Sequence, residues 1–420
     1  MNDGRVRYAR NGDIRLAYRV FGDNDTPLVF MPPYVSNVDL YDDTATPFAP
    51  FKEQLARDTT LIVWDKRGNG LSDPTDHVPT IDERMDDMHA VLDACGVESA
   101  ALAGGSEGGP LSLMFAGTYP ERVQSLVLYG TAARYSQAPD FPWGCSPEQI
   151  EEQVADIEAN WGEGALADVF LGDAAEIPGV RELWGRFQRA GASPTMARLT
   201  WQAVMEIDVR GVLGSIRTPT RVLAREGDRL APPDAAHALA SAIPGAEFRM
   251  MPPGPHLALD AADILASEIL EFVLRRARSS PSDRVLTTVL FTDIVGSTEQ
   301  LDAQGDERWR QQLDAHDRLV DVLLAKYQGH REKHTGDGVF ARFDGPTRAA
   351  RCSLELVSAL ATRGIRIRAG VHTGECERRG DEWSGMAVHL GARIGAMAGA
   401  GEVFASRTVR DLSVGSGLHF

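Results

Sequence analysis

The residue most clearly placed to carry out chemistry is Ser106, which lies in a Gly-x-Ser-x-Gly pattern running from Gly104 to Gly108. An apolar run at 99–103 precedes the pattern and a second apolar segment at 110–116 follows it, so we expect a strand, a sharp turn and a helix. A serine on such a turn is pushed out of the sheet, and glycines relieve the crowded backbone. The following helix then points its free N–H groups to where an oxyanion would form. The alternative is a glycine-rich turn without a catalytic role, and this pattern alone does not decide between them.

The first part of the chain alternates apolar strands with helical segments. Continuous apolar runs, typical of buried parallel strands, lie at 27–31, 60–64 and 126–130. An amphipathic helix is expected at 81–95, and two alternating runs around residues 11–13 predict a hairpin. This alternation predicts an α/β fold with a doubly wound, mostly parallel sheet covered by helices on both faces.

A second motif makes the assignment more specific. The segment from Asp65 to Asp73 fits Asp-x-Arg-Gly-x-Gly-x-Ser-Asp and precedes the motif around Ser106. Together the two motifs resemble the α/β-hydrolase family, over roughly residues 5–275, and we take 1–275 as the hydrolase domain. In that family the triad follows the chain order serine, acid, histidine.

The resemblance implies that Asp228 and His256 are the partners of Ser106. Asp228 follows the apolar strand expected at 220–224, and His256 follows the last strand expected at 246–251. His256 would take the proton from the serine, and Asp228 would fix the imidazole tautomer. Alone, these two residues would be read as ordinary turn and loop residues. Because the nucleophile is a serine, acyl transfer on an ester, lactone, thioester or amide is favoured over dehalogenation or epoxide opening.

The loop after the first core strand departs from the family. Where the family usually has His-Gly, this chain has Pro32-Pro33-Tyr34. Proline has no N–H group, but Tyr34 occupies the donor position and keeps its own. The N–H of Glu107, directly after the nucleophile, would be the second oxyanion donor. The alternative for this loop is that the domain is a small-molecule sensor whose triad no longer acts.

Residues 135–215 interrupt the alternation of strand and helix. They contain helical stretches and four of the seven tryptophans, which are Trp143, Trp161, Trp184 and Trp201. This segment is interpreted as a helical cap that closes over Ser106. Its apolar content favours a hydrophobic acyl or ring-bearing substrate, although each tryptophan could equally belong to the core of the cap.

Composition limits the function classes. The chain has 420 residues, 43% of them hydrophobic, and a net charge of −17, which disfavours general binding to nucleic acid or to an anionic membrane. It has no secretory leader pattern and no apolar run of about 18 residues that could cross a membrane. The cysteines Cys95, Cys145, Cys352 and Cys376 are scattered, as expected for reduced thiols. These features predict a cytoplasmic protein.

A small, polar and basic segment at 276–283 is expected to be an interdomain linker, after which the strand and helix pattern starts again. Asp293 and Asp337 each lie beside glycine at the end of an apolar strand, which suits a pair of divalent ions. The turn Gly296-Ser297-Thr298 would open a helix whose N–H groups can hold a triphosphate. The alternatives are a plain hairpin turn at Asp337 and a plain capping box after Gly296.

Residues 284–420 resemble the catalytic domain of class III nucleotide cyclases, an α+β ferredoxin-like fold. The resemblance rests on Phe-Thr-Asp-Ile-Val-Gly-Ser-Thr at 291–298 and on Lys-x-Thr-Gly-Asp-Gly at 333–338. It implies Asp293 and Asp337 as ligands of two Mg²⁺ or Mn²⁺ ions. It also implies Lys333 and Glu382 as base-reading residues, Arg368 on the triphosphate, and His389 and Arg393 at the transition-state positions.

Since sites of this family form between two such domains, the resemblance implies a homodimer that makes cAMP from ATP. Glu382 stands where the family usually has Asp or Thr, so the choice between ATP and GTP stays open. His389 replaces an asparagine and titrates near neutrality. The chain also ends at Phe420, before the family's closing strands and their lysine.

The sequence therefore predicts a capped serine hydrolase fused to a cyclase domain. One alternative treats the hydrolase half as a sensor that regulates the cyclase. The other treats the cyclase half as a nucleotide-binding or dimerisation module without activity. The natural substrate and any communication between the domains are not specified by the sequence.

Overall fold

The two regions of the sequence in which apolar strands alternate with helices form two separate sheets. The computed structural model describes residues 4–43, 46, 48–276, 284–297, 305–334, 338–379 and 382–420. The chain divides into two units, the first made mainly of residues 1–282 and the second mainly of residues 283–420. Residues 277–283 of the expected linker lie outside the described residues.

In the described part of the first unit, eight strands form one sheet in the order β1-β2-β4-β3-β5-β6-β7-β8. β1 and β2 form the expected hairpin, β2 is antiparallel to β4, and the remaining neighbours are parallel. The mostly parallel sheet that the sequence predicts is confirmed. The strands are β1 (Arg7–Asn11), β2 (Ile14–Phe21), β3 (Pro27–Met31), β4 (Thr60–Trp64), β5 (Ala100–Gly105), β6 (Val123–Tyr129), β7 (Thr220–Arg225) and β8 (Glu247–Met251).

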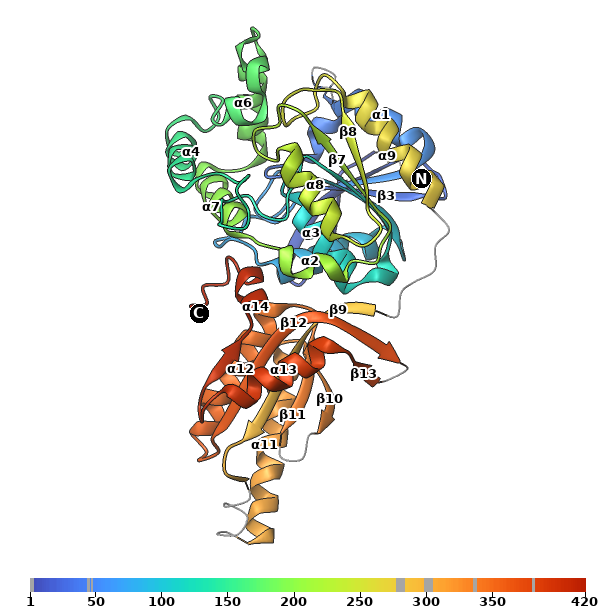
Figure 1. Ribbon diagram of the computed structural model, residues 1–420. Coiled ribbons are helices and arrows are strands. Elements are labelled where there is room, and N and C mark those ends of the chain that lie inside the picture. Colours follow the sequence, from blue (N-terminus) through green and yellow to red (C-terminus); the bar gives the residue numbers. More distant parts are fainter. Residues whose placement is uncertain are drawn as a thin grey trace. The chain divides into compact units, whose positions relative to one another are not determined.

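Helices cover both faces of this sheet (Figure 1). One face carries α1 (Phe48–Asp58) and α9 (Ala262–Arg276), whose apolar side chains pack with Ala101 and Ala103 of β5. Because side chains alternate along a strand, the residues between them face the other side. That side carries α2 (Ile81–Ala94), α3 (Gly108–Thr118) and α8 (Pro233–Ala242).

A group of helices lies between β6 and β7 in the chain, in the region expected to be the cap. Its helices are α4 (Pro147–Asn160), α5 (Ala167–Phe170), α6 (Val180–Gly191) and α7 (Pro194–Glu206). Ser146 caps α4 with a capping box and Ser193 caps α7, which explains where these helices begin. Trp184 and Trp201 are buried in one apolar cluster with Phe170.

The second unit contains a mixed sheet. In its described part the strands run in the order β10-β11-β9-β12-β13, and β14 pairs with β12 in parallel. One face of β9 packs against α11 and α12, and the other face packs against α13. A cyclase fold stays a prediction for this unit. The elements are β9 (Arg284–Ile294), α11 (Asp306–Lys326), β10 (His330–His334), β11 (Val339–Phe343), α12 (Pro346–Ala361), β12 (Ile367–Arg379), β13 (Glu382–Ser384), α13 (Met386–Met397), β14 (Val403–Ala405) and α14 (Arg407–Leu412).

Candidate active site

Ser106 lies on a strained turn between β5 and α3. Its φ is +52°, a left-handed conformation that residues with a side chain rarely adopt. The turn is also crowded: a Cβ on Gly104 would lie 2.5 Å from the Ser112 hydroxyl, and one on Gly108 would lie 2.9 Å from the Met31 carbonyl oxygen. Gly104 and Gly108 are therefore required by space, as expected for a strand–turn–helix that presents a nucleophile.

His256 and Asp228 form a buried pair at the ends of β8 and β7. The His256 Nδ1 atom lies 2.9 Å from Oδ2 and 3.0 Å from Oδ1 of the Asp228 carboxylate. Asp228 Oδ1 also accepts hydrogen bonds from the backbone N–H groups of Leu230 and Ala231. These contacts fix the carboxylate and leave the other ring nitrogen, Nε2, to act on a neighbouring proton.

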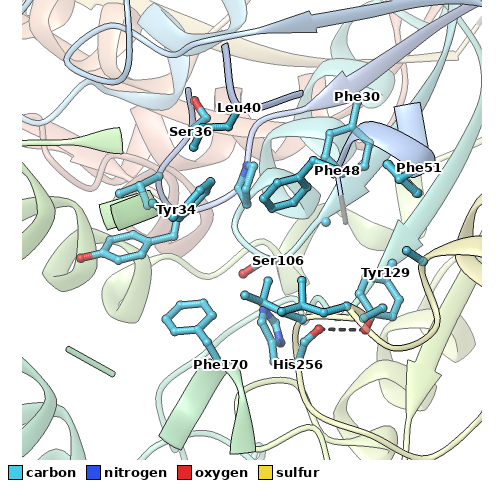
Figure 2. A pocket seen from close by; sticks show the side chains of 18 of the residues that line it. Phe30, Tyr34, Ser36, Leu40, Phe48, Phe51, Ser106, Tyr129, Phe170 and His256 are labelled. Atoms are coloured by element: carbon cyan, nitrogen blue, oxygen red, sulfur yellow. Dashed lines mark hydrogen bonds between the residues drawn. The ribbon is translucent and has the colours of Figure 1, made fainter. Parts of the chain in front are cut away.

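Ser106 and His256 line the same pocket, in which Figure 2 shows both side chains. Within the described residues no hydrogen bond joins the serine hydroxyl to the imidazole. In resting enzymes this contact is often long, and it tightens when a substrate binds. The structure thus brings together the three residues that the sequence singles out for the triad.

The two expected oxyanion donors are both available. Within the described part of the chain, no oxygen accepts a hydrogen bond from the backbone N–H of Tyr34 or of Glu107. Glu107 directly precedes α3, so its N–H lies at the positive end of that helix. The Tyr34 side chain is anchored in the cap, where its hydroxyl donates 2.6 Å to the Ala197 carbonyl.

Three charged side chains are buried behind the nucleophile, and sequence reasoning did not find them as a group. The Glu107 carboxylate pairs with Lys66 at 2.5 Å and with Arg84. Burial alone would raise the pKa of Glu107, but the charges of Arg84 and Lys66 outweigh it and hold that pKa below its usual value. Burial lowers the pKa of Lys66 to about 8, against the opposing effect of Glu107.

The loop that carries His256 is held by β6 and β7. Arg225, fully buried on β7, donates to the carbonyls of Pro252 and Pro253 and makes a bidentate ion pair with Asp260. The Tyr129 hydroxyl at the end of β6 donates 2.8 Å to the His256 carbonyl. These clamps were not predicted, because their partners are far apart in the sequence.

The pocket beside Ser106 is mostly apolar. Aromatic and aliphatic side chains make up most of its lining, as is usual for sites that bind small molecules. Its polar side chains are partly committed within the protein; for example, the Ser36 hydroxyl donates to Asp65 and the Asn37 amide donates to Ala190. Aromatic side chains from the cap, from α1 and from β3 form the walls, and they include Phe30, Phe48, Phe51, Phe170, Trp184 and Phe187.

In the second unit the structure joins two of the predicted site residues. Arg368 on β12 lies directly opposite Asp293 on β9, and its Nε and Nη2 atoms lie 2.9 and 2.5 Å from Asp293 Oδ2. The sequence predicts that Asp293 lies at the end of an apolar strand, and it is the last but one residue of β9, which pairs with β12 as far as Ile294.

The other predicted residues of this unit are not joined to that pair in the described structure. Lys333 on β10 and His389 and Arg393 on α13 are exposed, and Gly296 and Ser297 follow β9. Thr298 and Asp337 lie outside the described residues, and the side chain of Glu382 does too.

Among the described residues, no three His, Cys, Asp or Glu side chains gather so that they could hold a metal ion. The only expected ligand that is described is Asp293, and Arg368 already engages it. Asp337, the second expected ligand, lies outside the described residues.

Comparison with known proteins assigns the first unit. Residues 27–263 match the family model for the alpha/beta hydrolase fold. The chain is 30% identical to a pimeloyl-[acyl-carrier protein] methyl ester esterase of Stenotrophomonas maltophilia, over 56% of this chain and 90% of that protein. It is 27% identical to 3-oxoadipate enol-lactonase 2 of Acinetobacter baylyi, over 53% of this chain and 81% of that protein.

A solved structure agrees on the fold. A bromoperoxidase from Bacillus anthracis superimposes with a TM-score of 0.55 at 21% identity, over 64% of this chain and all of that one. The chain belongs to the α/β-hydrolase family. The family match ends before the second unit, which has no family assignment.

Two further observations concern the whole chain. None of the described helices has the length and apolar character needed to cross a bilayer. The four cysteines are all free in the structure, and burial raises the pKa of the thiols of Cys95, Cys352 and Cys376 to about 12.

Proposed function

We propose that the first unit is a serine esterase that hydrolyses esters or lactones with a hydrophobic acyl group. The observation that carries this proposal is the common pocket of Ser106 and the buried Asp228–His256 pair. The free N–H groups of Tyr34 and Glu107 support it, because an acyl-transfer site needs donors for the developing oxyanion. The names of the two curated relatives, an esterase and a lactonase, point the same way.

In this mechanism His256 Nε2 accepts the hydroxyl proton as Ser106 attacks the carbonyl carbon of the ester. The carbonyl oxygen becomes an oxyanion, which the two N–H groups stabilise. The C–O bond to the alcohol then breaks, and the imidazolium gives its proton to the leaving oxygen. Water attacks the acyl-enzyme by the same route and releases the carboxylic acid, which restores Ser106.

The walls of the pocket define the substrate class. Aromatic and aliphatic side chains surround the nucleophile, so an alkyl or aryl acyl group gains by leaving water. A charged acyl chain would lose its hydration without a partner. We therefore expect butyrate, hexanoate or phenylacetate esters to react faster than esters with a carboxylate on the acyl chain.

Covalent labelling tests the assignment without a known substrate. A fluorophosphonate should modify the peptide that contains Ser106, as seen by mass spectrometry. His256→Ala should slow this labelling strongly because the serine loses its base. Labelling at another residue, or equal labelling rates in both proteins, would favour the sensor alternative.

For the second unit we propose binding of a nucleoside triphosphate with Mg²⁺ or Mn²⁺, as the motifs around Asp293 and Lys333 suggest. The juxtaposition of Asp293 and Arg368 supports this proposal, since those residue types hold a metal ion and a phosphate respectively. An assay of cAMP formation from ATP, with each of the two metals, tests the cyclase activity that the motifs predict.

A homodimer through the second unit is part of the same proposal. On α13, the side chains of Met386, Leu390 and Met397 are 71%, 38% and 73% exposed. Such apolar exposure on one helix is consistent with a second copy covering it. Met386→Lys together with Met397→Lys should lower the dimer fraction in analytical ultracentrifugation, whereas an unchanged distribution would contradict this surface.

A further inference from the structure

One ammonium group joins the ends of three neighbouring strands. Lys66 follows β4, Tyr34 follows β3 and Glu107 follows β5, and these strands are adjacent in the order β4-β3-β5. The Lys66 Nζ atom donates 3.1 Å to the Tyr34 carbonyl and 2.5 Å to Glu107 Oε2. It thereby connects Tyr34 and Glu107, the two expected oxyanion donors.

The cluster is buried and is made of charged side chains. Lys66 and Glu107 are 3% and 4% exposed. Arg84 of α2 is 7% exposed and pairs with the second carboxylate oxygen of Glu107. Arg84, Lys66 and Glu107 thus form one buried network that includes the residue directly after Ser106, and the carboxylate of Asp65 also acts on Lys66.

Burial of these three charges costs free energy, so we expect the cluster to have a function. Removing three charges from water carries a penalty that apolar side chains of similar volume would avoid. A cluster that only filled space would not need a lysine that reaches the Tyr34 carbonyl. A rigid, positively charged support does have a use where an oxyanion develops, because preorganised donors act without reorganising during the reaction.

We propose that Lys66 is a positioning residue of the oxyanion hole. It holds the segments of Tyr34 and Glu107 at a fixed separation through its hydrogen bonds to the Tyr34 carbonyl and to the Glu107 carboxylate. The inference rests on the proposed esterase function, but its test does not depend on turnover alone.

The test compares Lys66→Met with a matched control, Lys52→Met, in the full-length chain. Lys52 also pairs with a carboxylate, but its partner is Asp42, at 2.7 Å, and not Glu107. For p-nitrophenyl butyrate, Lys66→Met should lower kcat by on the order of 10²-fold, the cost of losing one oxyanion donor, with KM little changed. Lys52→Met should match the wild type.

A transition-state mimic separates this role from general damage. Butylboronic acid adds to a serine hydroxyl and places a tetrahedral boronate oxygen in the oxyanion hole, so its affinity reports on that hole. Lys66→Met should weaken boronate binding, measured by calorimetry, by about the factor lost in kcat. If Lys66→Met does not fold, Lys66→Gln tests the same claim, since its amide keeps a donor for the Tyr34 carbonyl but removes the charge of the ammonium group; it should weaken boronate binding as well.

The outcomes are distinguishable. A wild-type chain that hydrolyses no ester contradicts the proposed function. Boronate affinity that is equal in the wild type and in the folded variant contradicts the positioning role of Lys66, whether or not turnover is seen. A loss that appears in KM alone, or equally in Lys52→Met, contradicts it too.

Discussion

The hydroxyl of Tyr129 donates a 2.8 Å hydrogen bond to the backbone carbonyl of His256. This bond ties the end of β6 to the loop that carries the base, while β7 supplies the acid and Arg225. The position of His256 therefore depends on two strands that are distant from it in the sequence.

Removal of the Arg225 hydrogen bonds should lower the free energy of unfolding. Arg225→Met leaves the Pro252 and Pro253 carbonyls without their donor and leaves Asp260 without its partner. We expect a loss of about 2–3 kcal/mol in the free energy of unfolding, since the lost hydrogen bonds come from a charged group. Urea unfolding of the variant measures this.

The control for this variant is Arg229→Met. Arg229 is 56% exposed in its pair with Asp173, so its change should stay within about 0.5 kcal/mol. Equal unfolding curves for the two variants would contradict the clamp.

Gly130, which follows β6, should not tolerate a side chain. Its φ is +54°, and a Cβ there would lie 3.3 Å from both Asp228 Oδ2 and His256 Cε1. Gly130→Ala should therefore shift the acid–base pair and lower kcat by more than tenfold, since misplaced catalytic groups cost rate steeply. Gly214→Ala is the control, because a Cβ at that position meets nothing within 4 Å. Full activity of Gly130→Ala would argue against this packing.

The pKa of Lys66 predicts the alkaline behaviour of the enzyme. Burial lowers this pKa to about 8, so the ammonium is present below pH 8 and is lost above it. Activity should fall as the pH rises through about 8, because the charge behind the oxyanion hole disappears. The groups that act on Lys66 are Glu107, which raises its pKa, Arg84, which lowers it, and Asp65, which raises it.

Two variants test whether this fall in activity at high pH comes from Lys66. Glu107→Gln removes the anion that supports the ammonium, so the alkaline fall should begin at lower pH. In Lys66→Met this titration is absent, and the residual activity should be flat across the same range. A pH–kcat profile that is identical in the wild type and in Glu107→Gln would contradict the assignment.

The second unit offers a separate prediction. Asp293 and Arg368 are 40% and 34% exposed, so their ion pair should contribute little to stability. If the unit binds a metal–nucleotide complex, Asp293→Asn should abolish ATP binding in the presence of Mn²⁺, measured by calorimetry. Asp411→Asn, which alters a pair on α14, should leave it unchanged. ATP binding that survives in Asp293→Asn would remove Asp293 from the site.

Local patterns were sufficient to locate the sheet and the triad. Ser106, Asp228 and His256 each follow an apolar strand, and a parallel sheet gathers such strand ends at one edge. The cluster of Lys66, Arg84 and Glu107 could not be found in this way, since its members come from a strand end, a helix and the serine turn and have no common spacing.

The extent of β9 shows a second limit of prediction from local sequence patterns. Residues 292–294 are a polar pair and one apolar residue, and their extended conformation depends on pairing with β12, which local composition does not reveal. For the second unit, the expected cyclase site extends over residues outside the described part of the chain, and its function stays a prediction.

The most direct test of the account is hydrolysis of p-nitrophenyl butyrate by the wild type and by Ser106→Ala, with both proteins shown to be folded by circular dichroism. The account predicts measurable turnover by the wild type and a loss of at least about 10³-fold in the variant, because the nucleophile is removed. Equal turnover by the two proteins, or none by either, would contradict it.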